Sequence, residues 1–440
     1  MGGRGHLTTP AHDNGRISPH TPPFLAAVLR IGLNTVDMSV APEDPGVVDT
    51  SIVNPNLPDR TSADAERPQK ASGDARHFAT MPDPFRMWRG GSLRGARVAY
   101  ETWGELSPQR DNAILLFTGL SPSAHAASSL TDPSDGWWEG MVGPGCAIDT
   151  RRYHVICVNS LGSCFGSTGP ASVDPATGAP YRVSFPDLSV EDIARGGFET
   201  LQSVGIDCAH TIIGPSLGGM VVLAYLAQFP GAARNAISIS GTAAASPFAI
   251  ALRSIQREAI LRDPNWRNGH YTAERPPATG MRIARKLGMM TYRSAAEWNV
   301  RFGRQPAATE HRQSHPFGAE FAIQSYLELH AQRFVRAFDP NCYLYLSRAM
   351  DRFDLTAHGG SVEHVLAASR LERALIIGVQ SDLLFPIEQQ RALAEASRKA
   401  GADTSFAPLD CLEGHDSFLI DLASFGREIA TFLGAPSQPD

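Results

Sequence analysis

The sequence predicts an α/β fold in which a mostly parallel sheet is covered by helices on both faces. Short, continuously apolar runs are typical of strands that are buried on two sides. They alternate with helical stretches, which favours strand–helix–strand units. The expected strands are 112–117, 153–158, 211–213, 236–240, 374–379 and 404–407. The expected helices include 189–203 and 217–228, the second of which ends before Pro230.

Composition narrows the class of protein. The chain has 440 residues, of which 42% are hydrophobic and 19% charged, so it can bury a large core. Its formal net charge is −6, so no basic excess indicates binding to nucleic acid. A run of about 18 apolar residues is absent, so we expect no transmembrane helix and no membrane partner.

The cysteines argue against a metal centre. Six are present, none in a C-x-x-C pair, and the histidines have no zinc-finger spacing. Scattered cysteines suit a reducing cytoplasm. The apolar stretch 23–29 ends at Arg30 and is followed by no cleavage site, so we expect a cytoplasmic protein.

The chain divides into regions of different pattern. Residues 1–75 are rich in Pro, Asp, Ser, Thr and Gly, and we expect a disordered extension. The α/β core is expected over 76–245 and 366–436. We interpret residues 246–365 as a helical lid over the carboxyl edge of the sheet. Its amphipathic segments are 248–262, 279–290, 320–337 and 341–352.

One motif points to chemistry. Gly214–Met220 has the pattern G-x-S-x-G, follows an apolar run and opens a helical one. Such a turn exposes its serine, here Ser216, and its glycines avoid clashes between strand and helix. The helix N-terminus favours a nearby oxyanion. The alternative is an ordinary strand–helix turn.

A serine nucleophile needs a general base, and the base needs an orienting carboxylate. With this motif the acid and then the histidine follow the serine along the chain. Asp382 and His415 each follow an expected strand, so we assign them these roles. The alternatives are a turn or N-cap aspartate and a loop histidine. Three other histidines lack this context: His210, His330 and His358.

An oxyanion hole needs two backbone N–H groups. Leu217, directly after the nucleophile, would supply one of them. The loop after the strand 112–117 would supply the other, and we favour Leu120. The alternative is that this loop is a polar surface turn.

Several segments together resemble the homoserine O-acetyltransferase family of α/β-hydrolase-fold acyltransferases. They are Tyr100–Gly104, Asn159–Ser163, Gly166–Pro170, the Gly214–Met220 motif, Arg257–Ile260, Tyr343–Asp351, Ser381–Pro386 and Gly414–Asp416. The resemblance implies an α/β-hydrolase fold and ping-pong acyl transfer from an acyl-CoA, through Ser216, to an amino-acid hydroxyl. It also implies a homodimer formed through the lid and no permanently bound cofactor.

The family pattern also places the charged groups of the acceptor. Its α-carboxylate would meet Arg285, helped by Tyr292, and its α-ammonium would meet Asp416. An arginine fork suits a carboxylate. The alternatives are solvated helix charges and, for Tyr292, a core position.

Two departures from the acetyl-transferring pattern concern the substrate. The loop residues Gly119, Leu120, Ser121 and Pro122 resemble the version found in serine O-succinyltransferases. Arg253 stands where the acetyl-transferring enzymes usually carry Asn, and it would pair with the distal carboxylate of a succinyl group. A buried arginine without such a partner is unfavourable. The alternative is a surface arginine on a lid helix.

These features favour succinyl transfer from succinyl-CoA to L-serine. The alternatives are acetyl or succinyl transfer to L-homoserine, a serine esterase, and a binding protein without catalysis. Serine and homoserine differ by one methylene, a difference worth about 1–3 kcal/mol in a pocket, and residue types do not resolve it.

Overall fold

An eight-stranded sheet forms the centre of the molecule. Its strands are β1 (His77–Thr80), β4 (Arg97–Trp103), β5 (Ala113–Phe117), β8 (His154–Val158), β9 (Ala209–Pro215), β10 (Ala233–Ile239), β11 (Arg373–Val379) and β12 (Asp403–Leu409). They lie in the order β1-β4-β8-β5-β9-β10-β11-β12. The pairs β1/β4 and β4/β8 are antiparallel, and the later pairs are parallel. Two short pairs, β2 (Phe85–Arg86) with β3 (Ser92–Leu93) and β6 (Val142–Gly143) with β7 (Ile148–Asp149), lie outside it.

The computed structural model describes Gly2 and residues 73–308 and 316–434. Almost all of the expected extension 1–75 therefore lies outside the described residues. The described residues from 73 onward belong to one compact unit.

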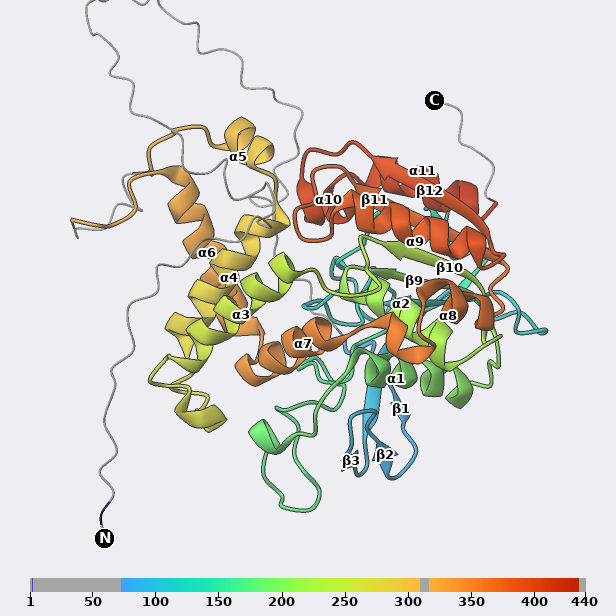
Figure 1. Cartoon of the computed structure of the whole chain (residues 1–440), viewed down its shortest axis with the longest axis horizontal. Helices are drawn as coiled ribbons and strands as arrows, with labels where there is room; N and C mark the ends of the chain where they lie inside the picture. The colour runs from blue at the N-terminus through green and yellow to red at the C-terminus, as the bar shows by residue number, and fades with distance from the viewer. Residues whose placement is uncertain (1, 3–72, 309–315, 435–440) are drawn as a thin grey trace, which may run out of the picture. The chain divides into compact units, whose positions relative to one another are not determined.

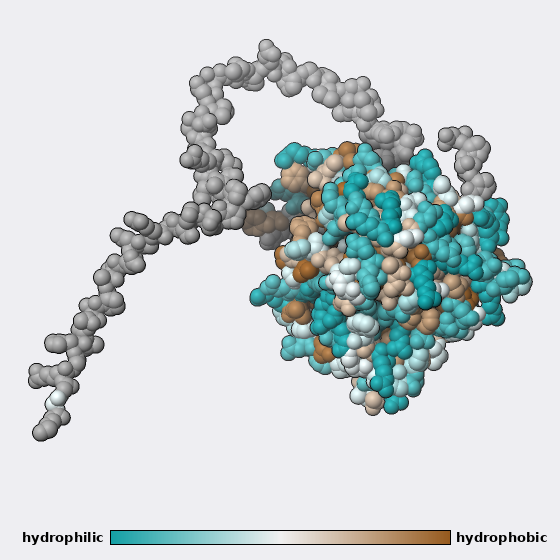
Figure 2. Space-filling model, turned by 45° about the vertical axis from the view of Figure 1, so that its right-hand side comes forward, coloured by the Kyte–Doolittle hydropathy of each residue, from teal (hydrophilic) through white to brown (hydrophobic). Residues whose placement is uncertain are grey.

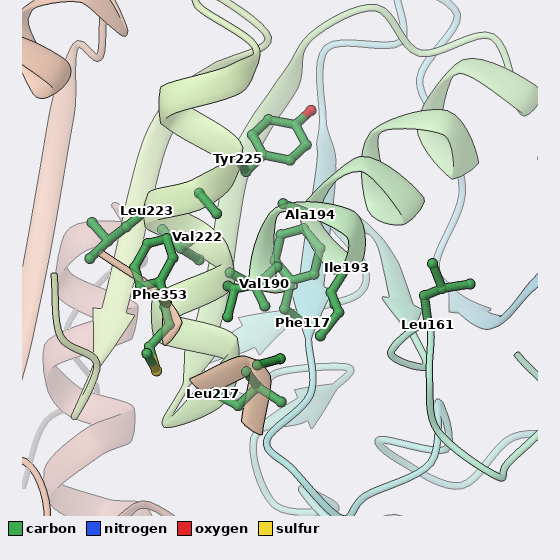
Figure 3. Packing of buried hydrophobic residues seen from close by; sticks show 14 of the residues in the cluster. Phe117, Leu161, Val190, Ile193, Ala194, Leu217, Val222, Leu223, Tyr225 and Phe353 are labelled. Carbon is green, nitrogen blue, oxygen red and sulfur yellow. The ribbon is translucent and has the colours of Figure 1, made fainter. Parts of the chain in front are cut away.

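Side chains of the central strands alternate between two cores, as the period of a strand requires. Leu115 and Phe117 of β5 enter one core with α1 (Val190–Ser203), α2 (Leu217–Gln228), α8 (Val362–Ala368) and α9 (Ile387–Lys399). Ile114 and Leu116 enter the other with α11 (Leu422–Phe432). Figure 3 shows Phe117 among helix side chains of the first core. The α/β fold class predicted from the sequence is confirmed.

The sequence does not predict β1 or β4. β1 has four residues, of which one is buried, and β4 alternates buried with partly exposed side chains. These two antiparallel strands, β1 at the edge of the sheet and β4 next to it, carry this weaker signal because they lack the continuous apolar run of a strand covered on both faces. The other six strands lie on the expected runs and extend some of them by up to three residues.

Residues 246–365 contain the helices α3 (Pro247–Leu261), α4 (Ala278–Tyr292), α5 (Ala295–Arg301), α6 (Ala322–Ala337) and α7 (Pro340–Arg352). Figure 1 shows α3, α4 and α6 packed together beside the sheet. Their starts follow local signals: the Ser246 hydroxyl and the Asp339 carboxylate cap α3 and α7, each followed by proline. α8 also begins in this region, but it packs on α2 and α9, so the core resumes before residue 366.

The surface in Figure 2 is mostly hydrophilic, with apolar residues scattered among polar ones. Among the helices of the described ranges, none is long and apolar enough to cross a membrane. Over the same ranges, no three His, Cys, Asp or Glu side chains gather where they could hold a metal ion.

Candidate active site

Ser216 lies on a tight turn between β9 and α2. Its backbone has φ 57° and ψ −119°, a conformation that few non-glycine residues adopt. A Cβ on Gly214 would lie 2.1 Å from the carbonyl oxygen of Gly218, and a Cβ on Gly218 would lie 2.7 Å from that of Phe117. Glycine is therefore required at both positions. The second contact also brings the carboxyl end of β5 against the turn.

His415 joins Ser216 to Asp382. Its Nε2 lies 2.8 Å from the Ser216 Oγ, and its Nδ1 lies 2.8 Å from Oδ2 of Asp382. Oδ1 of Asp382 accepts hydrogen bonds from the backbone N–H groups of Leu384 and Phe385 at 2.8 and 2.9 Å. The structure thus brings together the three residues that the sequence predicts, in the order nucleophile, base and orienting carboxylate.

The electrostatic environment of His415 supports a proton acceptor. Burial lowers the pKa of the imidazole, but the charge and hydrogen bond of Asp382 raise it by more, and Asp416 adds to the rise. The net pKa lies above the ordinary 6.5. Phe385 stacks on the ring, with centroids 4.9 Å apart, so the imidazole is fixed on its face as well as at both nitrogens.

Ser381 connects the loops that carry the acid and the base, a role that the sequence does not reveal. Its Oγ donates to the carbonyl of Cys411 at 2.6 Å and accepts from the N–H of Gly414 at 3.1 Å. Gly414 has φ 73°, and a Cβ there would lie 2.9 Å from the backbone nitrogen of Ser294, between α4 and α5. The Ser294 hydroxyl in turn donates to the carbonyl of Leu412.

The two residues expected to form the oxyanion hole lie on either side of the turn. Leu217 is the first residue of α2, where a backbone N–H has no partner within the helix. Its side chain is fully buried in the core shown in Figure 3, which fixes the backbone at this point. Leu120 lines the pocket beside Ser216. A Cβ on its neighbour Gly119 would lie 3.9 Å from the carbonyl oxygen of Pro215, so this loop runs next to the turn.

A pocket opens onto Ser216 and His415. The sequence-predicted residues that line it are Gly119, Leu120, Ser121, Pro122, Arg253, Arg285, Tyr292 and Asp416. Its wall is completed by side chains to which the sequence analysis assigns no role of their own: Leu252, Gln256, Tyr343, Met350, Leu384, Phe418 and Leu419. The predicted specificity residues therefore share one cavity with the nucleophile and the base.

Arg253 is buried in the wall of this pocket, with 4% of its surface exposed, so it is not a surface arginine. Its Nε donates to Oδ1 of Asp351 at 2.5 Å. Its Nη1 and Nη2 are buried and have no hydrogen-bond partner among the described residues. Because only Nε is bound to Asp351, the two terminal nitrogens can donate hydrogen bonds to a further acceptor. The two oxygens of a carboxylate match this pair of donor nitrogens.

Arg285 and Asp416 provide charges of opposite sign in the same pocket. The Arg285 guanidinium carbon lies 4.6 Å from the ring centre of Phe334 and 5.7 Å from that of Tyr292. Its Nε is buried without a hydrogen-bond partner in the described part of the chain. Asp416 forms an ion pair within the protein, because its Oδ2 lies 3.4 Å from the Nε of Arg293. The sequence analysis does not identify this neighbour.

Comparisons with known proteins show the family to which the chain belongs. The model of the alpha/beta hydrolase fold family matches residues 112–418. A serine O-succinyltransferase of Frateuria aurantia is 57% identical over 362 residues, covering 82% of this chain and 99% of that protein. The solved homoserine O-acetyltransferase of Bacillus anthracis is 25% identical with a TM-score of 0.75, covering 83% of this chain and 99% of its own. A solved esterase is 27% identical with a TM-score of 0.74, covering 81% and 99%.

Proposed function

The chain belongs to the α/β-hydrolase-fold family, in the group of the serine O-succinyltransferases, and on this premise we propose that it transfers a succinyl group from succinyl-CoA to the hydroxyl of L-serine. The observation that carries the proposal is Arg253. This buried cation lines the pocket of Ser216 and leaves two terminal nitrogens without partners among the described residues. A succinyl group brings a carboxylate for them, whereas an acetyl group brings none. Succinyl-CoA is thus a co-substrate, and no bound cofactor is required.

In the first half-reaction, the Ser216 Oγ attacks the thioester carbon while Nε2 of His415 takes the hydroxyl proton. The N–H groups of Leu217 and Leu120 bind the oxyanion of the tetrahedral intermediate. The C–S bond then breaks, and the departing CoA thiolate receives the proton from His415. Asp382 keeps the imidazole oriented and stabilises its charged form. Ser216 is left carrying a succinyl ester.

In the second half-reaction, the hydroxyl of L-serine gives its proton to His415 and attacks the ester carbon. The bond to the Ser216 Oγ breaks, the proton returns to that oxygen, and O-succinyl-L-serine is released. Arg285 binds the α-carboxylate of the acceptor with Tyr292 beside it, and Asp416 binds the α-ammonium. Positioning the acceptor in this way allows it to compete with water in a largely apolar pocket.

A thiol-release assay tests the proposal. Purified protein receives succinyl-CoA or acetyl-CoA, each with L-serine, L-homoserine or no acceptor. We expect fast release of CoA with succinyl-CoA and L-serine together. Faster release with L-homoserine or acetyl-CoA would contradict the assigned substrates and keep the acyl-enzyme mechanism. Equal release without an acceptor would indicate a hydrolase, as in the esterase that shares the fold.

We also propose that the partner of the chain is a second copy, joined through the lid, and that the reaction takes place in the cytoplasm, where CoA thioesters are available. Apolar side chains recur seven residues apart on two lid helices and are about half exposed: Phe248 and Ile255 on α3, and Ile283 and Met290 on α4. Light scattering after gel filtration should give twice the chain mass, and the double substitution Ile255→Glu, Ile283→Glu should give the monomer. A wild-type monomer would contradict this interface.

A further inference from the structure

His125 ends the loop that carries Leu120, and each nitrogen of its ring faces a hydrogen-bond acceptor. Nδ1 lies 2.8 Å from Oε2 of Glu101, and Nε2 lies 3.0 Å from the backbone oxygen of Ser134. The Ser134 Oγ, 3.2 Å from Nε2, gives its own proton to Asp132 at 2.6 Å, so it is an acceptor toward His125 as well. A neutral imidazole has a single N–H and cannot serve both sides. This arrangement needs the imidazolium.

The surrounding charges favour that form. The side chains of His125 and Glu101 are 12% and 5% exposed, so the pair is largely removed from solvent. The hydrogen bond that His125 donates to Glu101 raises the pKa of His125 to about 9; burial opposes this, and Ser134 and Asp132 add to it. Asp132 Oδ2 lies 3.9 Å from Nδ1, and Glu139 also acts on the ring. Beyond Glu101 lies Arg76, which Asp74 neutralises.

This ion pair ties the loop to the sheet. Glu101 lies in β4, which pairs with β8, and β8 pairs with β5. The loop begins at the end of β5. Two further hydrogen bonds hold the backbone of the loop. Nδ2 of Asn159 donates to the carbonyl oxygen of Pro122 at 3.3 Å, and the N–H of Trp137 donates to the carbonyl oxygen of His125 at 3.2 Å. Leu120 lies two residues before Pro122. Its N–H is therefore placed by the anchors that follow it.

We propose that His125, as an imidazolium bound to Glu101, is a positioning residue that holds the backbone from Gly119 to Pro122 where the Leu120 N–H can bind the oxyanion. The inference rests on the proposed acyl transfer at this site. His125 does not line the pocket, so it acts through the loop. Loss of its proton at alkaline pH removes the charge and one of its two donated hydrogen bonds, and the loop loses its anchor.

The pH dependence of kcat distinguishes positioning from a general loss of fold. Glu101→Gln keeps an acceptor for Nδ1 but removes the charge, so the alkaline limb should move at least one pH unit lower while the acid limb stays in place. His125→Gln should lower kcat about tenfold to a hundredfold, which is less than the hundredfold to thousandfold loss of a whole oxyanion donor because the Leu120 N–H is displaced but not removed, and it should abolish this alkaline limb. His154→Gln is the matched control, because His154 also bonds a carbonyl but lies at the start of β8. Unchanged limbs in both variants would overturn the proposal.

Two measurements separate this inference from the proposed function. In protein with ¹⁵N-labelled histidines, the His125 resonances, assigned by their loss in His125→Gln, should show both nitrogens protonated at pH 7.5; a neutral ring there would overturn the proposal. The rate at which a fluorophosphonate labels Ser216 depends on the oxyanion hole and not on the natural acyl donor. Slower labelling in His125→Gln supports the inference even if succinyl transfer to serine fails. Labelling at the wild-type rate overturns it even if that transfer is observed.

Discussion

The Nε of Arg253 lies 2.5 Å from Oδ1 of Asp351, whose other oxygen lies 2.6 Å from the Nη2 of Arg257. Two arginines of α3 thus share one carboxylate of α7. This leaves one uncompensated positive charge among the three groups. The carboxylate of an acyl group bound beside Arg253 would balance this charge. The pocket should therefore favour an acyl group derived from a dicarboxylic acid.

Replacing Arg253 should therefore change the choice of acyl donor. Arg253→Asn should lower kcat/KM for succinyl-CoA by roughly 30- to 5000-fold, because removing one partner of a buried charge pair costs about 2–5 kcal/mol. Activity with the uncharged butyryl-CoA should change much less. Arg262→Asn is the control, since Arg262 ends the same helix in solvent and pairs with Glu258. Equal losses with both donors would remove the specificity argument.

Arg285 should act in the other half-reaction. Arg285→Gln loses a charge-assisted contact worth about 1.5–3 kcal/mol, so KM for L-serine should rise by roughly one to two powers of ten. The burst of CoA released by acylation should keep its rate. Arg282→Gln, on the same helix but bound to Glu328 at 2.6 Å, should leave both quantities unchanged. A slower burst in Arg285→Gln would show that this arginine binds the donor.

The acid limb of the activity profile should lie above pH 6.5. A base works only when it is unprotonated, and the pKa of His415 is raised by Asp382 and Asp416 against the effect of burial. Activity should consequently fall as the pH decreases through the raised pKa. Asp416→Asn removes one of these charges, so the limb of the acylation burst should move to lower pH. An acid limb below 6.5 in the wild type would contradict this account.

The tight turn at Ser216 leaves no room for a side chain at Gly214, so even a methyl group there should strongly destabilise the protein. In Gly214→Ala the new methyl group would lie 2.1 Å from a backbone oxygen of α2, which cannot move without opening the turn. We expect the variant to lose several kcal/mol of stability or fail to fold, as measured by urea unfolding. In Gly426→Ala, within α11, the nearest atoms are 3.6 Å away, and alanine in a helix should raise stability by up to about 1 kcal/mol. Similar stability of the two variants would contradict the steric argument.

Much of this fold is predictable because its signals are local. Continuous apolar runs mark the parallel strands, and the Ser189 capping box and Pro340 mark where helices begin. The G-x-S-x-G pattern locates Ser216 because the turn excludes larger residues at Gly214 and Gly218. These features depend on residues that are close together in the chain.

The parts that cannot be read from the sequence depend on distant pairs. Arg253 and Asp351 are 98 residues apart, and His125 and Glu101 come from different elements, so neither pairing leaves a local pattern. The same holds for Arg293 beside Asp416. A resemblance indicates which side chains matter, but the partner that orients or neutralises each one emerges only from tertiary contacts.

A lid that only covered a pocket could be shortened or replaced without affecting the catalytic residues. Here the loop of His415 rests on the backbone between α4 and α5, where Gly414 meets Ser294 and the Ser294 hydroxyl binds Leu412. The region that carries Arg253 and Arg285 for recognition is thus also a support for the proton acceptor. A chimaera that carries another lid on this sheet would need the same contacts to the loop of His415. Without them, the graft would alter the rate of proton transfer as well as the choice of substrate.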